Sequence, residues 1–161
     1  IGTINENLKG YFMQLILASQ SPRRRELLSL FGIPFAVRVA DIDETMDPQA
    51  APFDEVARVS RLKAEATDHT PEDVVIAADT IVVCCDKILG KPHSEDEAKQ
   101  MLRLLSGRDH QVMTGVTVLR GEQAEVFTEI KNALCFLTFG KPAILILPMK
   151  QIHRIRTERD L

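Results

Sequence analysis

Residues 15–25 read LILASQSPRRR, a short apolar run followed at once by a helix signal. The four apolar residues 15–18 are typical of a strand that is buried on both faces of a sheet. Ser21 is a preferred N-cap residue, and Pro22 suits the first position of a helix. The stretch therefore predicts a buried strand that turns directly into a helix reaching Phe31, which is the building unit of an α/β fold.

The remaining pattern extends this unit along the chain. Apolar residues at helical spacing predict a helix over 54–67 and another that begins after Ser94, with Glu97 in the capping-box position, and ends at Gly107. The expected strands cover residues 35–39, 74–78, 112–119 and 124–128. The order is strand, helix, strand, helix, strand, helix and hairpin, which predicts an α/β fold with a mixed rather than wholly parallel sheet.

Composition excludes several classes of protein. The 161 residues are 45% hydrophobic and 27% charged, which suits one ordinary globular domain, and the net charge of −3 argues against a nucleic-acid or membrane-surface partner. Cys84, Cys85 and Cys135 are too few and too badly spaced for a disulfide framework, so we expect small buried side chains in a reduced compartment. Residues 1–12 lack the pattern of a signal peptide, and no apolar run is long enough for a membrane span. We expect a cytoplasmic protein.

Basic residues follow the first strand. Arg23 and Arg24 stand in the first turn of the expected helix, where backbone N–H groups and the helix dipole favour an anion. Arginine also has the geometry to bind phosphate oxygens, and Ser21 lies beside it. Two interpretations stay open from these residues alone: a phosphate site or a solvated basic helix face.

Acidic residues occupy two further positions. Asp41, Asp43 and Glu44 form a loop after a strand, and Asp79 follows the buried run 74–78. Sheets of this class bind ligands at the carboxyl ends of their strands, and carboxylates there suit Mg²⁺. The alternatives are a plain surface turn for the loop and a turn or capping residue for Asp79.

Lysines and histidines are less informative. Lys63 lies among apolar helix positions and Lys91 follows Gly90, and either could be an ordinary exposed lysine. Pro92 stands where a P-loop requires Ser or Thr, so that motif is excluded. His93 and His110 have no partner at zinc spacing.

Taken together, these motifs match a known pattern. They are LASQSPRRRELL (17–28), DIDE (41–44), LKA (62–64), AADTIV (77–82), GKP (90–92) and LSGRDHQVMTG (105–115). In this order and spacing they resemble the Maf family of nucleotide pyrophosphatases, over about residues 13–129. The resemblance implies a fold related to the inosine triphosphate pyrophosphatases, with an elongated mixed sheet, flanking helices and two lobes around a cleft.

The resemblance also implies a chemistry and its residues. The reaction is hydrolysis of a nucleoside triphosphate between the α- and β-phosphates, with Mg²⁺ or Mn²⁺ as cofactor. Asp79 matches the family's general base and, with Glu44, its metal site. The residues that match the substrate site are Ser21, Arg23, Arg24, Lys63, Thr80 and Lys91. Arg23 and Thr80 fall where the family discriminates between substrates.

One branch of the family fits best. Ser-Pro-Arg-Arg with Ala-Asp-Thr is similar to the branch that acts on dTTP and UTP. The branch that prefers 7-methyl-GTP has a tryptophan after Ser-Pro, whereas this chain contains none. The resemblance implies a hydrolase with a nucleoside triphosphate substrate, and it makes a homodimer possible.

The resemblance stops at about Ile130. A family segment of the form Asp-Lys-Ala-Gly-x-Tyr-x-Ile-Gln-Gly, whose glutamine contributes to the substrate site, has no match here. We therefore divide the chain into an upstream extension (1–12), a Maf-like domain (13–129) and a divergent tail (130–161). The alternative functions are a nucleotide-binding or regulatory Maf-like protein with impaired or no catalysis, and a phosphatase that acts on monophosphates.

Overall fold

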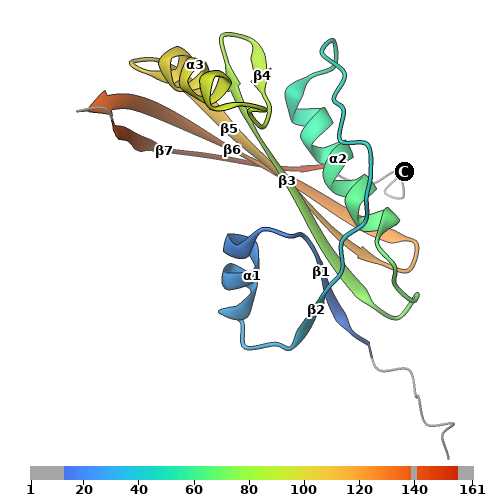
Figure 1. Ribbon diagram of the computed structural model, residues 1–161. Helices are drawn as coiled ribbons and strands as arrows, with labels where there is room; N and C mark the ends of the chain where they lie inside the picture. The colour runs from blue at the N-terminus through green and yellow to red at the C-terminus, as the bar shows by residue number, and fades with distance from the viewer. Residues whose placement is uncertain (1–12, 139–140, 156–161) are drawn as a thin grey trace, which may run out of the picture.

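The computed structural model describes residues 13–138 and 141–155, and the side chains of residues 13–133 (Figure 1). The predicted upstream extension, residues 1–12, lies outside the described residues. The elements are β1 (Leu15–Ala18), α1 (Pro22–Ser29), β2 (Phe35–Val37), α2 (Pro52–Ala66), β3 (Val74–Cys84), β4 (Lys87–Leu89), α3 (Glu95–Leu105), β5 (Asp109–Arg120), β6 (Gln123–Thr138) and β7 (Lys141–Ile155).

The seven described strands form one sheet in the order β2-β1-β3-β5-β6-β7, with β4 paired to β3. The strands β2, β1 and β3 are parallel, and every later pairing is antiparallel. The α/β class with an elongated mixed sheet is therefore confirmed. The elongation comes from β3, β5, β6 and β7, which are 11, 12, 16 and 15 residues long (Figure 1).

The prediction that a strand ends at Ala78 was wrong. One strand, β3, runs from Val74 to Cys84 and carries Asp79 in its middle. The β-branched residues after Asp79 favour an extended backbone, and β5 pairs with β3 as far as Val83. The parallel neighbour β1 does end here, because its last residue, Ala18, pairs with Ala77. Asp79 thus lies just beyond the carboxyl end of β1 but inside β3.

The expected strand 124–128 is the first part of a longer one. β6 continues through residue 130 to Thr138, and β7 pairs with it in antiparallel fashion on both sides of a register shift between Lys131 and Ala133. The backbone therefore shows no break at the proposed boundary of the tail. The division of the chain at residue 129 remains a prediction.

Helix α2 covers one face of the sheet, and the core beneath it is divided in two. One apolar cluster joins Ile16, Val75 and Leu119 near one end of the helix, and a second joins Val56, Ile81 and Met113 near the other. Between them runs a polar strip, defined here as Ser60, Lys63, Asp79, Thr117 and Thr128. Burying polar groups costs free energy unless they are hydrogen-bonded. Ser60 bonds to Thr117 and Lys63 bonds to Asp79, whereas Thr128 Oγ1 has no partner among the described residues.

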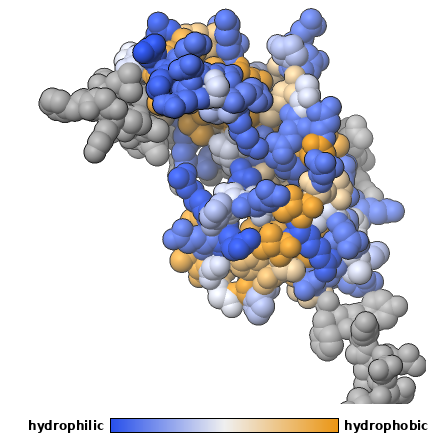
Figure 2. Space-filling model, in the orientation of Figure 1, coloured by the Kyte–Doolittle hydropathy of each residue, from blue (hydrophilic) through white to orange (hydrophobic). Residues whose placement is uncertain are grey.

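Helix α1, in contrast, buries none of its residues. The helix ends at Ser29 and does not reach Phe31 as predicted, and the apolar residues Leu27, Leu30 and Phe31 near its end are 56%, 78% and 74% exposed. Figure 2 shows hydrophobic side chains at the surface in the lower half of the view, where α1 and β2 lie. Within the described residues, no helix is both long enough and apolar enough to cross a membrane.

The prediction that the cysteines are buried was correct for Cys84 and wrong for Cys85. Cys84 is buried at the end of β3, whereas Cys85 is exposed. Cys85 and Asp86 have φ values of 54° and 60°, which place both in the tight turn between β3 and β4, away from the core. The side chain of Cys135 lies outside the described residues.

Candidate active site

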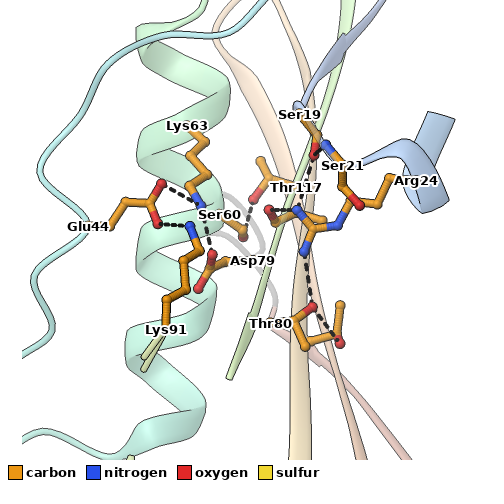
Figure 3. Close-up of polar contacts among 12 residues, drawn as sticks. Ser19, Ser21, Arg24, Glu44, Ser60, Lys63, Asp79, Thr80, Lys91 and Thr117 are labelled. Atoms are coloured by element: carbon orange, nitrogen blue, oxygen red, sulfur yellow. Dashed lines mark hydrogen bonds and ion pairs between the residues drawn. The ribbon is translucent and has the colours of Figure 1, made fainter. Parts of the chain in front are cut away.

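A cleft of about 660 Å³ opens where β1 passes into α1. Its walls come from the end of β1, the start of α1, the loop that follows β2, one residue of α2, two of β3 and Lys91 after β4 (Figure 3). Seven of the eight predicted site residues line it, namely Ser21, Arg24, Glu44, Lys63, Asp79, Thr80 and Lys91. The structure thus brings together residues that are up to 70 positions apart in the sequence.

The centre of the cleft is an ion pair between α2 and β3. Lys63 Nζ lies 2.7 Å from Asp79 Oδ1 and 3.1 Å from Glu44 Oε1. Asp79 is only 8% exposed, because α2 packs directly on β3 at this level. A buried charge needs a paired partner, and Lys63 supplies it. The predicted base and the predicted metal ligand therefore converge on one ammonium group.

Glu44 contacts two lysines from the opposite wall. Its second oxygen lies 3.6 Å from Lys91 Nζ, and the Lys91 side chain is 89% exposed. Partial burial raises the pKa of Glu44, but the hydrogen bonds and charges of Lys63 and Lys91 outweigh it and hold that pKa below its ordinary value. Glu44 is thus an anionic group that pairs with Lys63 inside the cleft and with the exposed Lys91 at its mouth.

Arg24 connects α1 to β3. Its guanidinium donates to Ala78 O at 2.7 Å, to Thr80 Oγ1 at 3.1 Å and to Ser19 Oγ at 3.3 Å. Three of its five N–H donors are therefore used within the protein, which fixes the plane of the group and leaves two donors for a ligand. The open alternative of a solvated basic helix face does not describe Arg24.

The other residues singled out near the first helix and in the acidic loop differ in whether they reach the cleft. Ser21 holds the N-cap position of α1, but its side chain makes no capping hydrogen bond, so the capping prediction was wrong in that respect. Ser21 lines the cleft instead. Arg23 is exposed and is not among the lining residues. Asp43 accepts a hydrogen bond from the Thr45 N–H at 2.8 Å and acts as a turn residue, whereas Asp41 lines the cleft.

Sequence reasoning missed two hydroxyl groups near the site. Ser19 is 6% exposed and accepts from both Arg24 and the Ser21 N–H. Thr114, on β5, lies 3.1 Å from Thr80 through their hydroxyl oxygens. Thr114 sits in a recognised motif, but nothing local indicates that it faces Thr80, because the register of β3 and β5 decides that contact.

The polar strip behind Asp79 depends on a close approach of backbones. Gly115 pairs with Asp79 across the sheet, and a Cβ atom at Gly115 would lie 2.5 Å from the carbonyl oxygen of Val56 in α2. Deeper in the same interface, Ser60 Oγ and Thr117 Oγ1 are 2.8 Å apart. The absence of a side chain at position 115 allows α2 to pack close enough to the sheet for Lys63 to contact Asp79.

The carboxylates of Glu44 and Asp79 could share one cation, but protein side chains alone would not complete its coordination. Glu44 and Asp79 both contact the single Lys63 ammonium group, so their oxygens point toward one region of the cleft. Residues 13–133, whose side chains are described, contain no cluster of three His, Cys, Asp or Glu that could hold a metal ion. Two carboxylates fit Mg²⁺ or Mn²⁺ when substrate phosphates and water supply the other ligands.

Comparison with known proteins adds a family and several relatives. The family model described as "Maf-like protein" matches residues 14–143. A dTTP/UTP pyrophosphatase of Anaeromyxobacter dehalogenans (strain 2CP-C) is 52% identical over 134 residues, which cover 81% of this chain and 68% of the relative. A dTTP/UTP pyrophosphatase of Bacillus cereus (strain G9842) is 46% identical over 117 residues, which cover 72% of this chain and 61% of the relative.

The chain spans 61% to 68% of the length of these relatives. Among solved structures, the Staphylococcus aureus Ham1 protein is similar at a TM-score of 0.47 and 16% identity, over 76% of this chain and 71% of that one.

Proposed function

The chain belongs to the Maf family, and we propose that it hydrolyses dTTP and UTP to the nucleoside monophosphate and pyrophosphate. Relatives that carry the name dTTP/UTP pyrophosphatase support this assignment at 46% and 52% identity. The observation that carries the proposal is the buried Asp79 carboxylate, which opens onto a cleft that also holds Lys63, Lys91 and Arg24. A base next to clustered cations is what attack of water on a polyphosphate requires.

The cations bind and orient the triphosphate. Lys91 is almost fully exposed at the mouth of the cleft, so its ammonium group can move to contact a phosphate with little loss of packing. Arg24 is held rigidly by three hydrogen bonds and presents its remaining donors in a fixed direction. Lys63, between Glu44 and Asp79, keeps positive charge close to the reacting atoms. Thr80, and in this proposal Arg23, contribute to the choice of nucleotide.

Asp79 orients the attacking water and accepts its proton. Its position in the middle of β3, with both flanking residues in the sheet, fixes the carboxylate more firmly than a loop would. A general base contributes on the order of 10²- to 10⁴-fold to the rate. Glu44 and Asp79 would hold a divalent cation, which neutralises charge on the phosphates and on the leaving pyrophosphate when it is bound.

Product analysis tests the proposal. With Mg²⁺ or Mn²⁺ present, dTTP and UTP should release pyrophosphate, and Asp79→Asn should slow the reaction by on the order of 10²- to 10⁴-fold. Asp43→Asn is the matched control, because Asp43 lies in the same loop as Glu44 but does not line the cleft. Release of orthophosphate from dTMP or UMP, offered in place of the triphosphates, would indicate a phosphatase acting on monophosphates, and binding of dTTP without release would indicate a nucleotide-binding protein. A homodimer and a cytoplasmic location remain predictions.

A further inference from the structure

We propose that Glu55 and Arg58 of α2 are positioning residues for the site, because they clamp the loop that carries Glu44 onto the helix. The loop comprises residues 38–47, between β2 and the turn before α2, and has no regular secondary structure. No ladder of backbone hydrogen bonds therefore holds Glu44 in place. The inference rests on the proposed function in one respect, which is that Glu44 acts in binding the metal and the triphosphate.

The clamp consists of four short hydrogen bonds. Arg58 Nε donates to Glu55 Oε1 at 2.7 Å, and one Arg58 terminal nitrogen donates to Glu55 Oε2, also at 2.7 Å. The backbone N–H of Asp47 donates to the same Oε2 at 2.8 Å. The same Arg58 terminal nitrogen donates to the backbone carbonyl of Thr45 at 2.9 Å.

These contacts hold the chain on both sides of Met46, directly after Glu44. Met46 itself packs against the apolar cluster of Val56, Ile81 and Met113, so the loop is anchored by apolar contact as well as by polar contact. Glu44 is the residue next to Thr45 and must place its carboxylate 3.1 Å from Lys63. A shift of Thr45 would move Glu44 with it, because only one peptide unit separates them.

The burial of Glu55 distinguishes the clamp from an ordinary surface ion pair. Glu55 is 5% exposed, and both of its oxygens are used. An acidic residue in the first turn would stabilise the helix dipole equally well if it were exposed, as Asp54 is. Arg61 and Glu65, four residues apart on the same helix, form an exposed pair at 2.7 Å, and exposed pairs of this kind contribute little.

The experiment compares Glu55→Gln with Glu65→Gln as the matched control. One readout is the rate at which endoproteinase Glu-C cuts the bond after Glu44, followed by mass spectrometry. A second is the dissociation constant for dTTP with Mg²⁺, measured in an Asp79→Asn background so that turnover does not interfere. A third is the split between KM and kcat for dTTP in the otherwise unchanged protein.

We expect Glu55→Gln to speed cleavage after Glu44 at least tenfold, and to weaken dTTP binding and raise KM by roughly tenfold or more, since misplacement of a binding group by about 1 Å can cost up to 10²-fold. The value of kcat at saturating substrate should change much less. Glu65→Gln should change none of these. Arg58→Lys, which keeps the charge but loses the contact with Thr45, should behave like Glu55→Gln and guards against a variant that does not fold.

Unchanged cleavage and unchanged dTTP affinity in both Glu55→Gln and Arg58→Lys would overturn the proposal, as would equal effects of Glu55→Gln and Glu65→Gln. Faster cleavage with unaltered dTTP affinity would also overturn it, because the loop would then not position a binding group. If the unaltered protein binds dTTP but releases no pyrophosphate, the proposed function fails while the cleavage and binding readouts still decide whether the clamp exists.

Discussion

Gly115→Ala is the substitution for which the structure gives the clearest physical expectation. Gly115 faces the backbone of α2, and an added Cβ atom would meet Val56 O at 2.5 Å, Val56 C at 2.8 Å and Ala57 N at 3.0 Å. Ordinary contacts of a Cβ atom begin at 3.4 Å. The helix must therefore retreat by about 0.9 Å at this point, and no side chain can swing aside to avoid it, because every contacted atom belongs to the backbone.

The magnitude follows from this geometry. Overpacking a well-packed interior usually costs about 1–3 kcal/mol, and a clash between backbones belongs at the upper end of that range. For a protein of this length, about 3 kcal/mol corresponds to a decrease of roughly 6–12 °C in Tm. Because Lys63 lies on the same helix, its contact with Asp79, now 2.7 Å, should lengthen as well, so activity should fall along with stability.

Chemical denaturation monitored by circular dichroism measures the loss of stability, and pyrophosphate release measures the loss of activity. Gly90→Ala is the control for stability, because a Cβ atom there meets nothing within 4 Å, and we expect a change of no more than about 0.5 kcal/mol. A Gly115→Ala protein with the unfolding free energy of the Gly90→Ala protein would refute the reasoning. It would mean that α2 does not lie as close to β5 as the structure indicates.

Two further expectations concern the charged groups. Hydrogen bonds from Arg58, opposed by burial and assisted by the Asp47 N–H, hold the pKa of Glu55 at about 2, below its ordinary value of 4.5. The ionised Glu55 therefore stabilises the fold fully above about pH 4.5, and this contribution is lost as the pH falls toward 2. In acid titrations, the difference in unfolding free energy between the unaltered protein and Glu55→Gln should shrink across that range. A constant difference would contradict this expectation. Lys63→Met should leave the Asp79 carboxylate buried without a cation and lower the unfolding free energy by about 3–5 kcal/mol in urea titrations, whereas a loss below about 1 kcal/mol would show that the pair is solvated.

Some of the architecture and most of the site could be predicted without tertiary information. Ser94 accepts a hydrogen bond from the Glu97 N–H at 3.1 Å and begins α3, as the capping pattern predicts. The glutamate side chain departs from that pattern, because it accepts from the backbone of His93 instead of Ser94. Such signals are read correctly because they involve residues within one turn of each other, so the local sequence contains all the atoms that take part.

The sequence by itself therefore determined the unit formed by β1 and α1, the mixed α/β class, the family and seven of the residues that line the candidate site. The tertiary structure alone decided that Asp79 lies inside β3, because pairing with β5 extends the strand past the point where β1 ends. It also decided that Lys63 joins Asp79 to Glu44, and that Glu55 is buried by a loop rather than exposed on its helix. Whether a charge is buried depends on partners that the chain supplies from far away, and that information appears only when the sheet and α2 have come together.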